Sequence, residues 1–256
     1  MSTTYRLTDL ALPYLLDGTG ISFCAKGLYI LICHVQPESI AHLALVSGVS
    51  GPVVKRECKA LKEEGWLSFD ITKSQRTIIT PTAPDGVQQE LVKWLDGVRA
   101  TWFPAGENIM RSMLDNTVAV SGCLDNCRPT HIANPTSGYR LEFDRFYYSQ
   151  GVAFEFQGVQ HRTRTSLHKS DEEFEDAQMR DLVKIGLSAR HNIEVVEITA
   201  ADLRIDRIIT KIPARLPLLR IDAGEFVRRL DGVGQEYIFW CKRNQGRKTK
   251  PDGGRA

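Results

Sequence analysis

The chain has 256 residues, of which 42% are hydrophobic and 25% are charged. This composition is that of an ordinary globular protein, and it excludes a collagen, a coiled-coil rod and a wholly disordered chain. The length allows one large domain or two small ones. The formal net charge is +2, from 33 basic and 31 acidic residues, and by itself it says little about partners.

The sequence predicts a soluble protein of the cytoplasm. No apolar run approaches the roughly 18 residues that span a bilayer, so we expect no membrane association. The apolar segment 11–16 is too short for a secretory signal and is broken by Pro13. The six cysteines do not form a disulfide pattern in a chain of this length, so we expect reduced thiols.

The first elements in chain order are helices. Ala25–Val35 is an apolar stretch of helix length, and a second helix is predicted after Ser39. Ser50 is the expected N-cap of a third helix, Gly51–Glu64. Pro52 fits the first turn of this helix, because an amide hydrogen there has no partner within the helix. This third helix carries several lysines and an arginine on its exposed side.

Two β-like runs follow, Trp66–Thr72 and Arg76–Thr80, so the order is helix, turn, basic helix and hairpin. The segments Ile40–Leu43, Gly48–Ser50 and Leu61–Leu67 resemble the MarR-like winged-helix families. The resemblance implies a winged helix-turn-helix whose second helix enters the DNA major groove and whose wing touches the backbone. It assigns DNA contacts to Ser50, Pro52, Lys55, Arg56, Lys59 and Arg76. A protein-docking module with a solvated basic face is the alternative.

The charge and the composition divide the chain into four predicted segments. Asp85–Arg99 has the pattern of an amphipathic connector helix, and Pro104–Gly106 marks the boundary after it. The last fifteen residues carry six basic and one acidic side chain, a local +5, so the rest sums to −3. We expect a winged helix-turn-helix at 1–83, a connector at 84–104, a second domain at 105–241 and a disordered basic tail at 242–256. The tail either aids solubility or attracts phosphates.

Two runs of alternating polar and apolar residues, Leu141–Tyr148 and Val152–Gln157, predict a β-hairpin. Counting outward from a two-residue loop gives three opposed pairs: Phe146 with Ala153, Asp144 with Glu155, and Glu142 with Gln157. Opposed side chains have β-carbons about 5 Å apart, where like charges destabilise a sheet. A hard divalent cation such as Mg²⁺ is the simplest reason for carboxylates to face each other. A slipped register and a solvated hairpin face are the alternatives.

An acid on one strand, a short turn and Glu-x-Gln on the next strand resemble the core of the PD-(D/E)XK nucleases. Asp144 matches the first acid, and Glu155–Gln157 matches the E-x-K element. The resemblance implies that Asp144 and Glu155 hold the metal. Gln157 stands where most members have lysine, as in an E-x-Q variant among restriction enzymes. The cation thought to position or activate the attacking water is therefore missing from this strand.

A narrower resemblance joins four segments in chain order: Gly106–Ile109, Leu141–Asp144, Glu155–His161 and Arg180–Lys184. Over about residues 105–200 they resemble the EDxHD homing endonucleases and the related very-short-patch repair (Vsr-like) endonucleases. This resemblance implies catalytic roles for Glu107, Asp144, Glu155, Gln157, His161 and Asp181. Glu107 has the alternative of stabilising a helix N-terminus, and His161 that of a structural histidine.

The rest of the second domain predicts a mixed sheet flanked by helices. Ser170 and Glu173 form a capping box at the start of a helix, and Ile193–Ile198 follows as an apolar strand, so strand, helix and strand form a crossover. Cys123, Cys127 and His131 have zinc-ligand spacing. They lack a clear fourth ligand, so structural Zn²⁺ is not expected.

Together these features predict an α/β (α+β) chain in which a winged helix-turn-helix precedes a PD-(D/E)XK-like mixed sheet flanked by helices. The expected function is an Mg²⁺-dependent endonuclease, with Mn²⁺ as a second usable ion, that hydrolyses phosphodiester bonds of double-stranded DNA. Restriction, homing, repair and mobile-element cleavage all fit. The alternative is a catalytically degenerate, DNA-binding transcriptional regulator, and a homodimer is left open. A ligand-sensing transcription factor has no recognisable pocket signature here.

Overall fold

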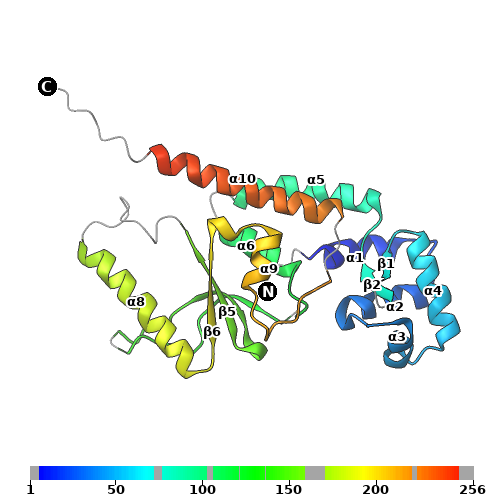
Figure 1. The fold of residues 1–256 in the computed structure, drawn as a ribbon, viewed down its shortest axis with the longest axis horizontal. Coiled ribbons are helices and arrows are strands. Elements are labelled where there is room, and N and C mark those ends of the chain that lie inside the picture. The colour runs from blue at the N-terminus through cyan, green and yellow to red at the C-terminus, as the bar shows by residue number, and fades with distance from the viewer. Residues whose placement is uncertain are drawn as a thin grey trace.

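The computed structural model describes residues 6–71, 77–102, 106–120, 122–135, 137–158, 171–220 and 224–247. These residues form a mixed α/β chain with a four-stranded mixed sheet and a separate two-stranded hairpin. In Figure 1 the first four helices and the hairpin lie at one end of the molecule, α8 lies at the other, and the sheet lies between them. The predicted fold class is confirmed.

The order helix, turn, helix and hairpin is present in the first part of the chain. Its elements are α1 Leu7–Asp17, α2 Phe23–Val35, α3 Ile40–Ser47, α4 Gly51–Glu63, β1 Leu67–Ile71 and β2 Thr77–Pro81. Ser39 caps α3 by accepting a hydrogen bond from the His42 amide at 3.1 Å. Gly48 ends α3 in the left-handed region, at φ 67°. Ser39 therefore fixes the start of α3, and Gly48 allows the sharp turn between α3 and α4.

Apolar side chains from these helices and the hairpin share one core. Buried residues from α2, α3, α4, the α4–β1 junction and β2 are Leu28, Tyr29, Ile32, Leu43, Val54, Cys58, Leu61, Trp66 and Ile79. The rings of Tyr29 and Trp66 meet edge to face, with centroids 5.5 Å apart. The expected basic face of α4 is therefore left outside this core.

Helix α5 (Asp85–Trp102) and helix α10 (Glu225–Arg247) lie side by side along one edge of the molecule (Figure 1). Arg229 of α10 joins them, with its Nη2 2.6 Å from Asp96 Oδ1. The predicted connector, Asp85–Arg99, is confirmed and extends three residues further.

The expected start of the C-terminal tail at residue 242 is wrong. Helix α10 continues to Arg247, so the first residues of the expected tail are helical. The physical reason is that Tyr237 and Cys241 are buried on the inner side of α10, and this packing carries the helix past the aromatic run. Residues 248–256 lie outside the described part of the chain.

The four-stranded sheet has the order β3-β4-β5-β6, with β3 (Leu124–Cys127), β4 (Phe143–Tyr147), β5 (Val152–Gln157) and β6 (Glu194–Thr199). The pairs β3–β4 and β4–β5 are antiparallel, and β5–β6 is parallel. Helix α8 (Asp171–Arg190) lies between β5 and β6 in the chain, as the predicted crossover requires. The internal position expected for the second hairpin strand is confirmed, because β5 pairs on both sides.

Helices cover both faces of this sheet. On one face, Phe154 and Ile198 pack into the main core with α6 (Gly106–Asp115), α9 (Ile205–Lys211) and α10. On the other face, Ala153 and Ile193 belong to a second cluster, against which Leu187 of α8 packs. Two short 3₁₀ turns, Tyr148–Gln150 and Ala200–Asp202, follow β4 and β6.

The two parts of the chain hold each other through two arginines. Arg6, just before α1, donates from Nε to the Asp115 carbonyl at 2.9 Å at the end of α6. Arg220, between α9 and α10, donates from its backbone amide to Gln36 Oε1 at 2.8 Å and from Nη1 to the Pro37 carbonyl at 2.7 Å. The main core runs through both parts, and the predicted domain boundaries stay a prediction.

Within the described residues, no single helix has the length and apolar character needed to cross a membrane. Only α2 and α3 taken together, bent by 105° between them, meet that criterion by length and composition.

Candidate active site

The β4–β5 hairpin brings Asp144 and Glu155 to adjacent positions. The paired residues are Arg145 with Phe154, Phe146 with Ala153 and Tyr147 with Val152. This is the predicted register; the ladder ends at Arg145 and Phe154, and continued by one step it would set Asp144 opposite Glu155. Gly151 closes the turn at φ 62°, where a Cβ would lie 2.8 Å from the Asn192 carbonyl, so glycine is required there. Glu142 precedes β4, so its predicted pairing with Gln157 is not part of the ladder.

Both carboxylates lie on the α8 side of the sheet. Side chains alternate along a strand, so Glu155 shares the side of Ala153 and of the second cluster, opposite to Phe154. Lys184 of α8 contacts Glu155 there, with Nζ 2.6 Å from Oε2. Asp144 bends across the end of the ladder, where its Oδ2 accepts a hydrogen bond from the Phe156 amide at 2.6 Å. The pair is therefore held at the end of β4 and β5.

Burial makes both carboxylates costly to ionise. It raises the pKa of Glu155 to about 7, with the Lys184 ammonium opposing this rise and the Asp144 carboxylate adding to it. Burial also raises the pKa of Asp144, although the Phe156 amide and the Lys184 charge lower it. Glu155 Oε1 is buried and, among the described residues, has no hydrogen-bond partner. A buried oxygen in this state is open to a cation or a donor.

Glu107 and Arg111 of α6 reach the same site. Glu107 lies in the first turn of α6 and forms an ion pair with Arg111, one helical turn further on. Arg111 Nη2 also donates to the Asp144 carbonyl at 2.8 Å. Burial raises the pKa of Glu107, and the Asp144 charge adds to the rise. The structure thus brings Glu107 within electrostatic range of Asp144, as the sequence predicted.

A buried arginine fixes the strand that carries Asp144. Arg145 is fully buried, and its Nη1 donates to Asp115 Oδ1 of α6 at 2.7 Å. Its Nε donates to Asp125 Oδ1 of β3 at 2.8 Å. These bonds tie α6 and β3 to β4, and they hold Asp144 on the face opposite to this network.

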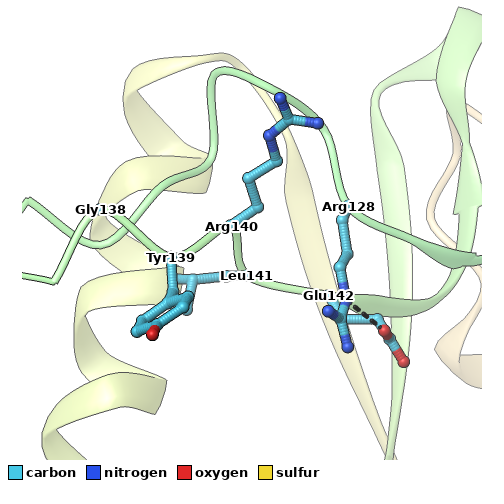
Figure 2. A pocket seen from close by; sticks show the side chains of 6 residues that line it. All are labelled: Arg128, Gly138, Tyr139, Arg140, Leu141 and Glu142. Carbon is cyan, nitrogen blue, oxygen red and sulfur yellow. Dashed lines mark hydrogen bonds and ion pairs between the residues drawn. The ribbon is translucent and has the colours of Figure 1, made fainter.

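The loop between β3 and β4 forms a shallow depression lined by Arg128, Gly138, Tyr139, Arg140, Leu141 and Glu142. Figure 2 shows Arg128 reaching Glu142, with Nε 2.6 Å from Oε2, while Arg140 points away from this pair. Tyr139 is 78% exposed. The charge of Glu142 also contributes to the raised pKa of Glu107 and of Asp144, so this loop adjoins the carboxylates.

Sequence reasoning assigned six catalytic residues, and the structure describes four of their side chains. Asp144 lies near Glu155 and within electrostatic range of Glu107, and Gln157 is half-buried at the end of β5. His161 lies outside the described residues; Asp181 lies in α8, but its side chain is outside them. Their roles stay predictions, and so does the capping box, because Ser170 and the Glu173 side chain lie outside the described part of the chain.

Two residues of the site were missed. Arg111 follows Glu107 by four positions, and this helical spacing is a signal that the sequence offered. Lys184 stands in the segment quoted for the family resemblance, but without any assigned role. It is separated from Glu155 by 29 residues, so its contact depends on how α8 packs on the sheet.

The donor set fits a hard cation held by two carboxylates. The described residues contain no group of three or more His, Cys, Asp or Glu side chains placed to share one ion. Mg²⁺ commonly uses one or two protein carboxylates and keeps several waters, so Asp144 and Glu155 are sufficient. The partnerless Glu155 Oε1 is the observation that favours such an ion.

The residues with zinc-ligand spacing are dispersed. Cys123 packs against the main core, whereas Cys127 packs against the second cluster. His131 instead lies beside His191, with ring centroids 4.6 Å apart. All six cysteines are free thiols. This arrangement gathers no zinc ligand set within the described part of the chain.

The basic side of α4 is exposed, as predicted. Lys55, Arg56 and Lys59 all point away from the core. Arg56 Nη2 lies 2.5 Å from Glu57 Oε1, and Lys59 Nζ lies 3.6 Å from Glu63 Oε1. The exposed Ser50 stands at the N-cap without a capping hydrogen bond, and Pro52 is exposed in the first turn.

Arg76, the residue predicted on the wing, lies outside the described residues. The DNA contacts expected of this face and of the wing stay predictions. Comparisons with family models, curated proteins and solved structures gave no match to this chain.

Proposed function

We propose that this chain is an Mg²⁺-dependent endonuclease that hydrolyses phosphodiester bonds of double-stranded DNA, with Mn²⁺ as a second usable ion. The observation that carries the proposal is the juxtaposition of Asp144 and Glu155 on one side of the sheet, where a buried Glu155 oxygen has no hydrogen-bond partner among the described residues. Opposed buried carboxylates destabilise a fold unless something positive stands between them.

Asp144 and Glu155 would hold the cation, through the oxygens that Phe156 and Lys184 leave open. When bound, such an ion polarises a phosphate oxygen and lowers the pKa of a bound water. Arg111 joins the Glu107 carboxylate to the Asp144 backbone carbonyl, so that Glu107 is proposed to orient a water near the pair. His161 and Asp181 are proposed to take part in proton transfer, on the family resemblance alone.

The exposed side of α4 is proposed to contact the DNA backbone and major groove. Three basic side chains there, Lys55, Arg56 and Lys59, support electrostatic attraction to phosphates. Arg128 and Arg140 line the depression of the β3–β4 loop together with Glu142, and they are proposed to meet a DNA strand that enters the site. The free thiols of all six cysteines support a location in the reducing cytoplasm.

One observation favours a second candidate, a DNA-binding regulator that has lost its nuclease activity. Gln157 at the end of β5 has no charge, where most members of the resembled superfamily have lysine. In this alternative α4 still binds DNA, while the carboxylates hold no catalytic ion.

The test is cleavage of a set of unrelated supercoiled plasmids with Mg²⁺, with and without EDTA. We expect nicked or linear product from the wild-type chain, and a loss of at least about 100-fold in Asp144→Asn and Glu155→Gln. Glu194→Gln is the matched control, because Glu194 is an exposed carboxylate at the start of the neighbouring strand β6. Equal inertness of wild type and Asp144→Asn on every plasmid, with DNA binding retained, would favour the regulator.

A further inference from the structure

Lys184 is the one cation of α8 that the described side chains place at the Asp144–Glu155 pair. Its Nζ lies 2.6 Å from Glu155 Oε2, and the two side chains are only 15% and 13% exposed. The same ammonium stands 5.4 Å from the centre of the Phe143 ring. A lysine is rarely buried to this extent without a partner or a function.

Lys184 supplies a positive charge at a place where strand β5 carries no lysine. In the E-x-K pattern the strand itself carries the lysine two residues after the glutamate, and here that residue is Gln157. Arg111, the other cation near the pair, is committed to Glu107, Asn126 and the Asp144 carbonyl. Lys184 is therefore the ammonium that directly contacts the carboxylate of Glu155.

We propose that Lys184, from the crossover helix, takes over the part of the missing strand lysine and acts as a positioning residue for cleavage. The proposal rests on the nuclease function proposed above. The ammonium holds Glu155 in a fixed orientation and places a positive charge beside the carboxylate pair. If the reaction takes place at this carboxylate pair, the Lys184 charge stabilises the negative charge that develops on the attacking water or the phosphate.

An ordinary ion pair that holds α8 to the sheet is the competing explanation. The two explanations differ in what should happen when the charge is moved. A merely structural bridge depends on the helix position, whereas a functional ammonium can be supplied from β5 as well.

The experiment compares Lys184→Met, Lys184→Arg and the double variant Gln157→Lys/Lys184→Met. Methionine keeps the unbranched stem that packs on Phe143 but removes the charge. Lys211→Met is the matched control, because Lys211 Nζ forms an ion pair 3.1 Å from Asp202 Oδ2, in another part of the fold. Each variant is assayed for thermal unfolding, for Mn²⁺ binding by calorimetry, and for kcat and KM on a plasmid that the wild type cleaves.

We expect Lys184→Met to lower kcat by about 100-fold with little change in KM, and to bind Mn²⁺ at least as tightly as the wild type. Because Lys184 lowers the pKa of Glu155, binding is measured at a pH where Glu155 is ionised in both chains, and there the loss of a neighbouring positive charge favours cation binding. The double variant should regain at least about a tenth of the wild-type kcat, and Lys184→Arg should keep part of it.

Two results would overturn the proposal while leaving the nuclease function in place. One is an active wild type with a Lys184→Met variant that cleaves equally well. The other is loss of Mn²⁺ binding, thermal stability and cleavage together in Lys184→Met, with no recovery on Gln157→Lys. A wild-type chain that neither binds Mn²⁺ nor cuts DNA would instead refute the proposed function, and this inference with it.

Discussion

Arg145 Nη1 lies 2.7 Å from Asp115 Oδ1, and this arginine side chain is completely shielded from water. Asp125 Oδ1 accepts a second bond from the same guanidinium, at 2.8 Å. Arg145 follows Asp144 directly in β4, so the network fixes the backbone that presents the candidate metal ligand. Stability and geometry of the site therefore depend on the same side chain.

Replacing Arg145 by methionine should lower the free energy of unfolding by about 3–5 kcal/mol, because two largely buried carboxylates lose the positive charge they share. Arg128→Met is the control, since Arg128 is 64% exposed and its ion pair with Glu142 should contribute about 1 kcal/mol or less. Urea denaturation at pH 7 measures both. Similar losses in the two variants would contradict the burial argument.

The stability of the metal-free chain should fall as the pH rises from about 5 to 8. Burial raises the pKa of Glu155 from 4.5 to about 7, so between these values the folded chain binds more protons than the unfolded chain. The expected loss is up to about 3 kcal/mol, and the raised pKa values of Asp144 and Glu107 act in the same direction.

Urea denaturation in EDTA at pH 5 and pH 8 checks this dependence. Glu155→Gln should flatten most of it, whereas Glu194→Gln, at an exposed position of β6, should leave it unchanged. A wild-type chain that becomes more stable over this pH range would show that Glu155 is ionised in the fold at pH 5.

Gly106→Ala should destabilise the chain by about 1–3 kcal/mol, because the added Cβ would stand 2.2 Å from Phe156 Cζ and 2.8 Å from Tyr237 Cε1. Gly97→Ala in α5 meets no atom within 4 Å and should stabilise by up to about 1 kcal/mol. Thermal unfolding compares the two. Since Glu107 follows Gly106, the first variant should also reduce cleavage; equal melting temperatures would disprove the close packing.

Lys55→Ala/Lys59→Ala on α4 should weaken DNA binding and lower the slope of log K against log salt by about 1 for each lysine. The reason is that each lysine that contacts a phosphate releases a counterion. Fluorescence anisotropy in an Asp144→Asn background, where DNA should stay intact, gives the slope. Lys93→Ala in α5, another exposed lysine, is the control. An unchanged slope in the double variant would favour the protein-docking alternative.

The parts of the fold that the sequence predicted are those marked by capping residues and short turns. Ser39 and Gly48 mark the ends of α3, and the short loop before Gly151 sets Phe146 opposite Ala153. These features depend on a few neighbouring residues, so they survive in any tertiary context. The Asp144–Glu155 juxtaposition followed from the same register.

What escaped prediction depends on distant contacts. Lys184 meets Glu155 only because α8 packs on one face of the sheet. Helix α10 continues through Arg247 because Tyr237 and Cys241 find buried places, which the basic composition of the segment did not reveal. Tertiary packing overrides local composition in both cases.

Arg6 and Arg220 have a practical consequence for dissecting this molecule. Each half of the chain inserts an arginine into the other half, and α5 and α10 cover each other's apolar sides. A fragment ending near residue 104 would lose the partners of Arg6 and the Arg220 side chain itself, and would expose Leu91 and Leu95 to water. The halves therefore need to be co-produced as complementing fragments, and the proposed DNA recognition and the proposed cleavage are better separated with point substitutions than with truncation.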